Sequence, residues 1–211
     1  MGKVLGVQQF LTSRKKRMEF SGPWYDLLGC PEPFGSWIIW GLSGSGKTSF
    51  CCRLAKYLTH FGRVAYLSLE EGDSLSLQRT FEDVNMMEVN GKLVLLDMGV
   101  DEMLERLEKP KSWDIVIIDS LQYSQINYDR YKEIRDKFPK KLFIFISHAD
   151  GKNPKGPAAD SIRYDSGCKI YVEAFRATAN SRYLKNGQRQ KPFIIWEEKA
   201  YLYWKYKLYD L

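Results

Sequence analysis

The sequence is poor in the residues that build metal centres and disulfide frameworks. Its 211 residues include two histidines and four cysteines, and no Cys-x-x-Cys pair occurs. Zinc sites and disulfide scaffolds need closely spaced Cys or Cys/His groups. We therefore expect reduced thiols in or near the core at Cys30, Cys51, Cys52 and Cys168.

Long hydrophobic runs are also missing. No apolar stretch approaches the ~20 residues that span a bilayer, and the N-terminus lacks the apolar segment of a signal peptide. We expect a cytoplasmic protein with no membrane partner. Hydrophobic residues make up 44% of the chain and charged residues 27%, which is typical of a globular protein. The net charge of +6 permits nucleic-acid binding without requiring it.

Short apolar runs do occur, and amphipathic stretches separate them. The runs cover residues 37–40, 64–69, 93–96, 115–118 and 142–146. Near-continuous apolar strands are typical of a parallel sheet that is covered on both faces. The amphipathic stretches predict helices over residues 47–60, 75–85, 100–109 and 128–138. This alternation predicts an α/β fold with a mainly parallel, doubly wound sheet and helices on both faces.

The two ends of the chain depart from this alternation. Beyond about residue 165, apolar and aromatic segments predict strands over residues 169–175, 193–198 and 201–206, which would extend the sheet in antiparallel fashion. Residues 1–29 form a weakly patterned lead-in that carries the basic run at residues 14–17. That run is either a solvated arm or a phosphate contact. We expect a single domain over residues 30–211.

A phosphate-binding loop follows the first predicted strand. Residues 41–48 read Gly-Leu-Ser-Gly-Ser-Gly-Lys-Thr and precede a predicted helix. Glycines let successive N–H groups converge on one phosphate, and the helix N-terminus adds positive potential. Lys47 can reach the β- and γ-phosphates, and Thr48 can ligate Mg²⁺. The expected ATP-binding residues are Gly41, Ser43, Gly44, Ser45, Gly46, Lys47, Thr48 and Ser49.

Carboxylates follow two of the predicted strands. Asp119 ends the run 115–118 and is expected to ligate Mg²⁺ as a Walker B residue. Glu70 and Glu71 end the run 64–69, so that either could accept a proton from water that attacks the γ-phosphate. Surface acids that cap the next helix are the alternative interpretation of this pair.

These motifs, in this order, resemble those of the RecA-like P-loop ATPases, in particular the branch of RadA/Sms, the DnaB helicases and KaiC. Ser68-Leu69-Glu70 is similar to the Ser-Leu-Glu of replicative helicases, and Pro33-Phe34-Gly35 resembles the approach to the P-loop in that branch. Residues 146–152, followed by Gly156-Pro157, resemble the RadA Gly-His-Val-Thr-Lys pattern with its later Gly-Pro. The resemblance covers about residues 30–185.

The resemblance implies catalytic roles for several residues. Lys47 and Glu70 would be catalytic, with Glu71 as the alternative base, and His148 would sense the γ-phosphate. Arg182 would reach the active site of a neighbouring subunit, by partial likeness to the RadA Lys-Asn-Arg-Phe-Gly motif, and Arg176 is its alternative.

The resemblance also implies a homo-oligomer, as a ring or filament, that acts on or near single-stranded DNA. Lys152 and Lys155 in a loop over residues 149–161, and the basic stretch 182–191, would contact the phosphate backbone. Tyr123 and Tyr128 would either stack on bases or pack within the protein.

Three classes of function therefore remain open. A chain with no large N-terminal domain and no zinc ribbon fits a minimal phage or mobile-element member of the RecA-like group, which is an analogy. The alternatives are a P-loop nucleotide or small-molecule kinase and a non-catalytic ATP-dependent assembly protein.

Overall fold

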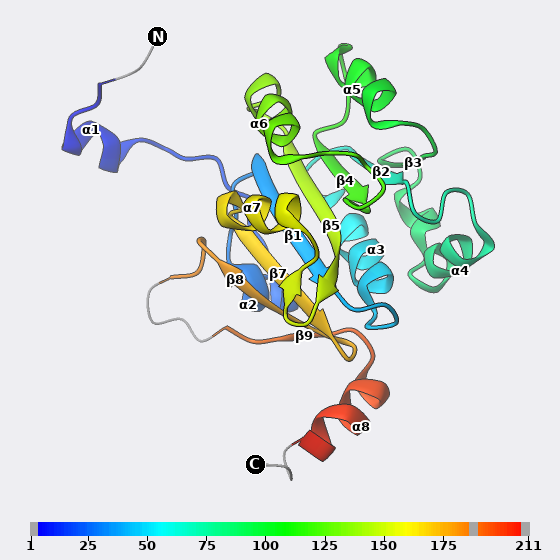
Figure 1. Ribbon diagram of the computed structural model, residues 1–211. Coiled ribbons are helices and arrows are strands. Elements are labelled where there is room, and N and C mark those ends of the chain that lie inside the picture. Colours follow the sequence, from blue (N-terminus) through cyan, green and yellow to red (C-terminus); the bar gives the residue numbers. More distant parts are fainter. Residues whose placement is uncertain (1–3, 186–189, 208–211) are drawn as a thin grey trace.

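A largely parallel β-sheet forms the centre of the molecule. The computed structural model describes residues 4–185 and 190–207 (Figure 1). Along the sheet the strands follow the order β3-β2-β4-β5-β1-β7-β8-β9, and the short β6 pairs with β5. The strands are β1 (Gly35–Gly41), β2 (Val64–Ser68), β3 (Leu93–Leu96), β4 (Ile115–Asp119), β5 (Leu142–Asp150), β6 (Asn153–Pro154), β7 (Cys168–Glu173), β8 (Arg176–Ser181) and β9 (Phe193–Ile194).

Helices α2 to α7 cover the two faces of this sheet. The helices along the chain are α1 (Val7–Thr12), α2 (Gly22–Leu28), α3 (Lys47–Leu58), α4 (Leu75–Asp83), the 3₁₀ turn η1 (Met86–Val89), α5 (Val100–Glu108), α6 (Tyr128–Lys137), α7 (Pro157–Asp165) and α8 (Glu197–Lys207). One hydrophobic cluster joins the sheet to α2, α3, α4 and η1, and a second joins it to α5, α6 and α7. No helix among the described residues is long and apolar enough to cross a membrane.

The apolar runs of the central strands β1, β2, β4 and β5 fold as strands because each has to be buried on both sides, whereas the edge strand β3 leaves Leu95 exposed. In β1, Trp37 and Ile39 belong to the first cluster, whereas Ile38 and Trp40 belong to the second. All four are at most 7% exposed. Strands β1 to β5 and β7 pair in parallel, whereas β7–β8 and β8–β9 pair antiparallel. The predicted α/β sheet and its antiparallel C-terminal extension are therefore confirmed.

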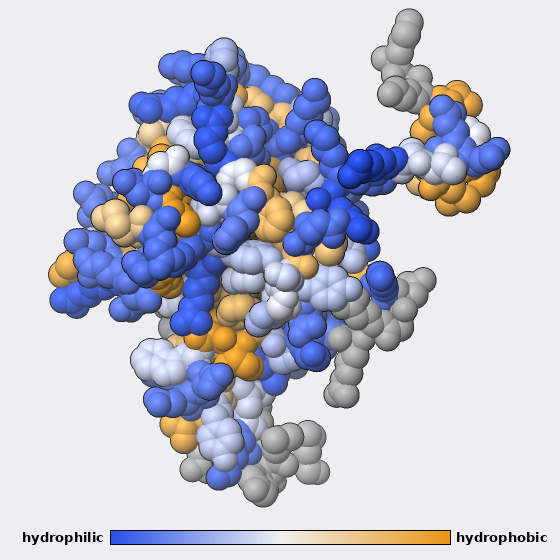
Figure 2. Space-filling view, turned by 180° about the vertical axis from the view of Figure 1, so that it is seen from behind, coloured by the Kyte–Doolittle hydropathy of each residue, from blue (hydrophilic) through white to orange (hydrophobic). Residues whose placement is uncertain are grey.

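The described part of the lead-in, residues 4–29, divides into two parts. Met18, Phe20 and the apolar side of α2 are buried in the same cluster as β1 and α3. In contrast, α1 has no buried residue and lies away from the sheet (Figure 1). Apolar atoms cover much of this projecting helix (Figure 2). The packed core thus begins before residue 30.

Of the three strands predicted beyond residue 165, the first is confirmed as β7 and the second is shorter than predicted, since β9 covers only Phe193–Ile194. The third prediction was wrong, because the segment 201–206 lies within α8. Its alternating aromatic residues favour a strand locally. However, the helix places two acidic residues, Glu197 and Glu198, in its first turn, where the helix dipole favours negative charge. It also lets Trp204 pack against the turn between β7 and β8, where its indole N–H donates to Ala174 O at 3.3 Å.

The loop expected over residues 149–161 is also mostly regular structure. Strand β5 continues to Asp150 and forms a hairpin with β6 through Gly151, which has a φ of 58°. Helix α7 then begins at Pro157, a favoured first helical residue. This helix was missed because only Ala159 and Ile162 are buried along it. Strand β8 was missed for a similar reason, since its sequence Arg-Ala-Thr-Ala-Asn-Ser is largely polar.

The four cysteines are free thiols. Cys51 and Cys52 lie on the buried side of α3, and Cys168 is buried at the start of β7, whereas Cys30 is partly exposed. Burial raises the pKa of all three buried thiols.

Candidate functional site

The P-loop lies at the carboxyl end of β1, and its glycines are required by close packing. A Cβ atom at Gly41 would lie 2.2 Å from the carbonyl oxygen of Val172 on the adjacent strand. Gly44 and Gly46 have φ values of 71° and 96°, which L-residues with side chains rarely adopt. The hydroxyl of Ser45 is buried and has no hydrogen-bond partner among the described residues. These features fit a loop whose polar groups receive a phosphate.

Lys47 is the first residue of α3, and its ammonium group bends back over the loop. Its Nζ donates a hydrogen bond to Leu42 O at 2.9 Å. Burial lowers the pKa of Lys47, although the carboxylates of Glu70 and Asp119 act in the opposite direction. Lys47 therefore lies close enough to Glu70 and Asp119 for their charges to affect its pKa.

Asp119 ends β4 and is only 9% exposed. The hydroxyl of Tyr66 on β2 donates to its Oδ2 at 2.5 Å. Burial raises the pKa of Asp119 to about 6, while this hydrogen bond opposes the rise. The peptide bond between Asp119 and Ser120 is cis. The charge of Asp119 acts on Lys47, Cys51 and Cys52, so its carboxylate lies close to the helix that carries Lys47 and Thr48.

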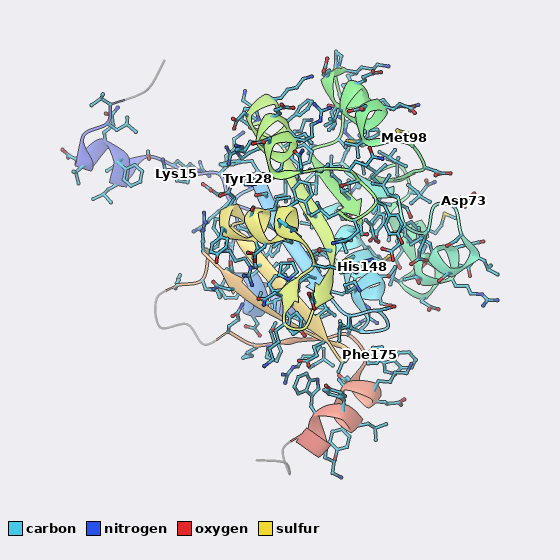
Figure 3. All side chains as sticks on the ribbon, viewed as in Figure 1. Lys15, Asp73, Met98, Tyr128, His148 and Phe175 are labelled. Carbon is cyan, nitrogen blue, oxygen red and sulfur yellow. The ribbon has the colours of Figure 1, made fainter. Side chains whose placement is uncertain are left out.

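Glu70 and His148 come together from two different strands. Glu70 follows β2, His148 lies near the end of β5, and His148 Nε2 is 2.9 Å from Glu70 Oε2. Burial by itself would raise the pKa of Glu70, but the hydrogen bond from His148 and the nearby charges of His148 and Lys47 lower it overall. Glu70 is therefore ionised at neutral pH. Figure 3 labels His148 at this edge of the sheet.

Glu71 faces a different neighbour. Its Oε2 accepts a hydrogen bond from the Ser74 hydroxyl at 3.3 Å, and Ser74 is the N-cap of α4. The two acids are adjacent in sequence, but only Glu70 contacts His148 in the structure.

Gln122 connects these residues to the β5–β6 hairpin, and the sequence analysis missed it. Its side-chain oxygen accepts from the His148 backbone N–H at 3.1 Å. Its amide nitrogen donates to Ser147 Oγ and to Lys155 O, both at 2.9 Å. Gln122 lies three residues after Asp119 in the sequence, and this short spacing could have indicated that its side chain lies near the site.

The two candidate arginines lie at opposite ends of β8. Arg182 follows β8 at the end that pairs with the start of β7, far along the strand from the P-loop, and its guanidinium donates to Tyr164 O at 3.1 Å. Arg176 begins β8 near the P-loop, and its guanidinium lies 3.3 Å from the ring centroid of Trp204. Burial lowers the pKa of Arg176.

The candidate DNA contacts are dispersed. Lys152 and Lys155 are exposed on the β5–β6 hairpin. Tyr123 is 55% exposed, and its ring centroid is 6.3 Å from that of His148. In contrast, the ring of Tyr128 stacks on that of Tyr131 and its hydroxyl donates to Asp165, which is structural packing. Part of the basic stretch 182–191, residues 186–189, lies outside the described residues.

The donor set suits magnesium rather than a metal held by protein ligands alone. No group of three or more His, Cys, Asp or Glu side chains forms a metal site within the described parts of the chain. Mg²⁺ typically takes one or two protein oxygens together with substrate phosphates and waters. Thr48 and Asp119 supply a hydroxyl and a carboxylate of this kind.

Solved structures of other proteins have a similar fold, and two of them serve as examples. The flagellar accessory protein FlaH of Methanocaldococcus jannaschii matches with a TM-score of 0.58 at 20% identity, over 85% of this chain and 93% of that one. A KaiC-like protein of Pyrococcus horikoshii matches with a TM-score of 0.56 at 18% identity, over 86% and 94%. No protein-family model and no curated protein matched the sequence. From the sheet order, the P-loop at the end of β1 and these neighbours, we conclude that the protein has a RecA-like P-loop fold.

Proposed function

We propose that the protein is a cytoplasmic Mg-ATP hydrolase whose single RecA-like domain covers residues 30–211 and also takes in the buried part of the lead-in, from Met18 through α2. The observation that carries the proposal is the contact between the Glu70 carboxylate and His148, next to the P-loop lysine and the buried Asp119. A P-loop alone holds a triphosphate. An ionised carboxylate beside it adds a base, which favours hydrolysis over simple binding.

In this proposal the loop N–H groups and Lys47 hold the β- and γ-phosphates. Lys47 exchanges its hydrogen bond to Leu42 O for phosphate oxygens. Glu70 orients a water molecule, accepts its proton as the water oxygen bonds to the γ-phosphorus, and ADP leaves with the bridging oxygen. A carboxylate has acceptor sites beyond the one that His148 uses. Thr48 and Asp119 would hold Mg²⁺, which would neutralise charge on the phosphates.

The decisive experiment compares Glu70→Gln with Glu71→Gln. Glu70→Gln should bind ATP as the unmodified protein does and lose hydrolysis by at least about 100-fold, because the amide cannot accept the proton. Glu71→Gln should retain hydrolysis, since its carboxylate contacts Ser74 instead. Phosphate release and nucleotide binding are measured for both, with Lys47→Ala as the variant that loses binding. Full hydrolysis by Glu70→Gln would refute the proposed base.

We further propose that hydrolysis is coupled to a single-stranded DNA partner through the β5–β6 hairpin. Lys155 N–H donates to His148 O at 2.8 Å, and Lys155 O accepts from Gln122. In this proposal a change at His148 is transmitted to Lys155 and to the hairpin that also carries Lys152, and the two exposed lysines suit a phosphate backbone. Single-stranded DNA should stimulate phosphate release, and Lys152→Ala combined with Lys155→Ala should remove the stimulation without lowering the basal rate. Equal stimulation of the double variant would contradict this role.

A further inference from the structure

The C-terminal part of the chain lies directly against the P-loop. Two backbone hydrogen bonds make this connection: Phe175 N–H donates to Ser45 O at 2.9 Å, and Ile195 N–H donates to Phe175 O at 2.8 Å. The turn between β7 and β8 and the segment that leads into α8 are therefore fixed to the loop expected to hold phosphate.

Apolar side chains of this segment cover one side of the loop. A Cβ atom at Gly46 would lie 3.1 Å from Cδ1 of Phe175 and 3.6 Å from Cδ1 of Ile195. Trp196, the next residue, is 48% exposed, and its ring centroid lies 6.0 Å from that of Phe175. We call Phe175, Ile195 and Trp196 the aromatic shelf. Figure 3 labels Phe175 beside the first turn of α8.

Contacts of Trp204 fix the β7–β8 turn that carries Phe175 of the aromatic shelf. The indole N–H of Trp204 donates to Ala174 O in the β7–β8 turn, and the guanidinium of Arg176 lies over the same indole ring at 3.3 Å. On the exposed side, Lys199 Nζ lies 3.8 Å from the ring centroid of Trp196. Lys199 is itself exposed, so its ammonium group can leave this π-face for solvent and give it up to a ligand ring.

The direction in which a nucleotide must extend leads to this shelf. Glu70 follows β2, Asp119 ends β4 and His148 lies near the end of β5. These three strands all lie on one side of β1 in the sheet. If these residues act on the γ-phosphate, that end of the triphosphate faces them. The nucleoside then leaves the P-loop on the other side of β1, where β7, β8 and the aromatic shelf lie.

We propose that the aromatic shelf is the base-binding subsite and that it takes the purine ring of the nucleotide, with Trp196 as the main contact. This inference rests on the proposed function of the P-loop. Base-to-aromatic contacts add affinity that is independent of the phosphates. Lys199 leaves the face of Trp196 when the purine occupies it.

The test separates the base from the phosphates. Binding of ATP and of inorganic tripolyphosphate is measured by calorimetry for the unmodified protein and for Trp196→Ala. The variant should bind ATP about tenfold more weakly, equivalent to about 1.4 kcal/mol, with tripolyphosphate affinity unchanged. Retained tripolyphosphate binding also shows that the variant is folded. Tyr201→Ala, which removes a 61% exposed aromatic ring from the same helix, should change neither affinity.

A second readout uses the intrinsic fluorescence of Trp196. ATP should change the tryptophan emission of the unmodified protein, and Trp196→Phe should lose that change while keeping ATP affinity within about threefold. If Trp196→Ala binds ATP normally, or loses ATP and tripolyphosphate affinity equally, the base subsite is refuted while the P-loop site stands. If the unmodified protein binds neither ligand, or Lys47→Ala binds both normally, the P-loop site is refuted and the base subsite with it.

Discussion

At the scale of single residues, Asp119 combines a stability cost with a proposed role in holding Mg²⁺. Its folded pKa of about 6 exceeds the ordinary value of 3.8, and burial is the main cause. Folding therefore disfavours the charged form of Asp119. The free energy of unfolding falls as the pH rises from 3.8 to about 6, and above that pH the full cost of the buried charge is present. The shift corresponds to at most about 3 kcal/mol.

Asp119→Asn should therefore be more stable than the unmodified protein at pH 8, by up to about 3 kcal/mol. The gap should narrow as the pH is lowered to 5, because Asp119 is then largely protonated. Urea unfolding at the two pH values measures this. The same variant should lose Mg-dependent hydrolysis, because an amide replaces the carboxylate. Equal stability of the two proteins at pH 8 would contradict the buried charge.

Tyr66→Phe serves as the matched control, because it removes the hydroxyl that donates to Asp119 and keeps the ring. The loss of this bond should raise the pKa of Asp119 further. The acid limb of the pH–rate profile should then move to higher pH, whereas Asp119→Asn has no activity to titrate.

At the scale of elements, the β5–β6 hairpin depends on Gln122. Its side chain bonds to backbone groups of His148 and Lys155, which lie on the two arms of the hairpin region. Gln122→Ala should loosen the hairpin and speed backbone amide exchange over residues 150–155 by about tenfold, the equivalent of one or two lost hydrogen bonds. Gln78→Ala, an exposed glutamine on α4, is the control. Unchanged exchange after Gln122→Ala would show that the turn at Gly151 holds the hairpin by itself.

The elements differ in how far sequence predicts them, and burial is the reason. Each central strand lies between two helical layers and is therefore apolar along its whole length. Such a run can be recognised from the sequence alone, as in residues 37–40 and 115–118. Helix α7 buries two residues and α8 packs along one side only, so local propensity and packing compete there. For α8, the aromatic alternation favoured a strand and the contact with the β7–β8 turn selected a helix.

The residues of the candidate site also differ in how far the sequence predicts them. The P-loop, Glu70, Asp119 and His148 occupy strand ends, and strand order brings such ends together in any doubly wound sheet. Gln122 and Tyr66 depend on side-chain directions that a linear pattern does not record. The aromatic shelf requires the C-terminal segment to return to the loop at Ser45, and this contact spans 130 residues of sequence.

At the scale of the whole molecule, the proposed role of Arg182 requires assembly. Arg182 lies at the end of β8 remote from its own P-loop, so in our proposal it serves a neighbouring subunit of a homo-oligomer. In the unmodified protein, the rate of hydrolysis per molecule should rise with protein concentration as subunits assemble. Arg182→Ala should retain ATP binding and lose this rise. Mass by light scattering, with and without ATP, is measured beside phosphate release. Arg79→Ala, an exposed arginine on α4, is the control, and a fully active monomer would refute the trans role.

The buried thiols of α3 allow the separation of this helix from the sheet to be measured by chemical labelling. Cys51 and Cys52 lie one turn beyond Lys47 on the side of the helix that faces the sheet. Alkylating reagents react with exposed thiolates, so these two sites are labelled only when α3 separates from the sheet. The labelling rate, read by mass spectrometry, therefore gives the opening frequency of the nucleotide-binding helix without any engineered probe, and a bound nucleotide should slow it.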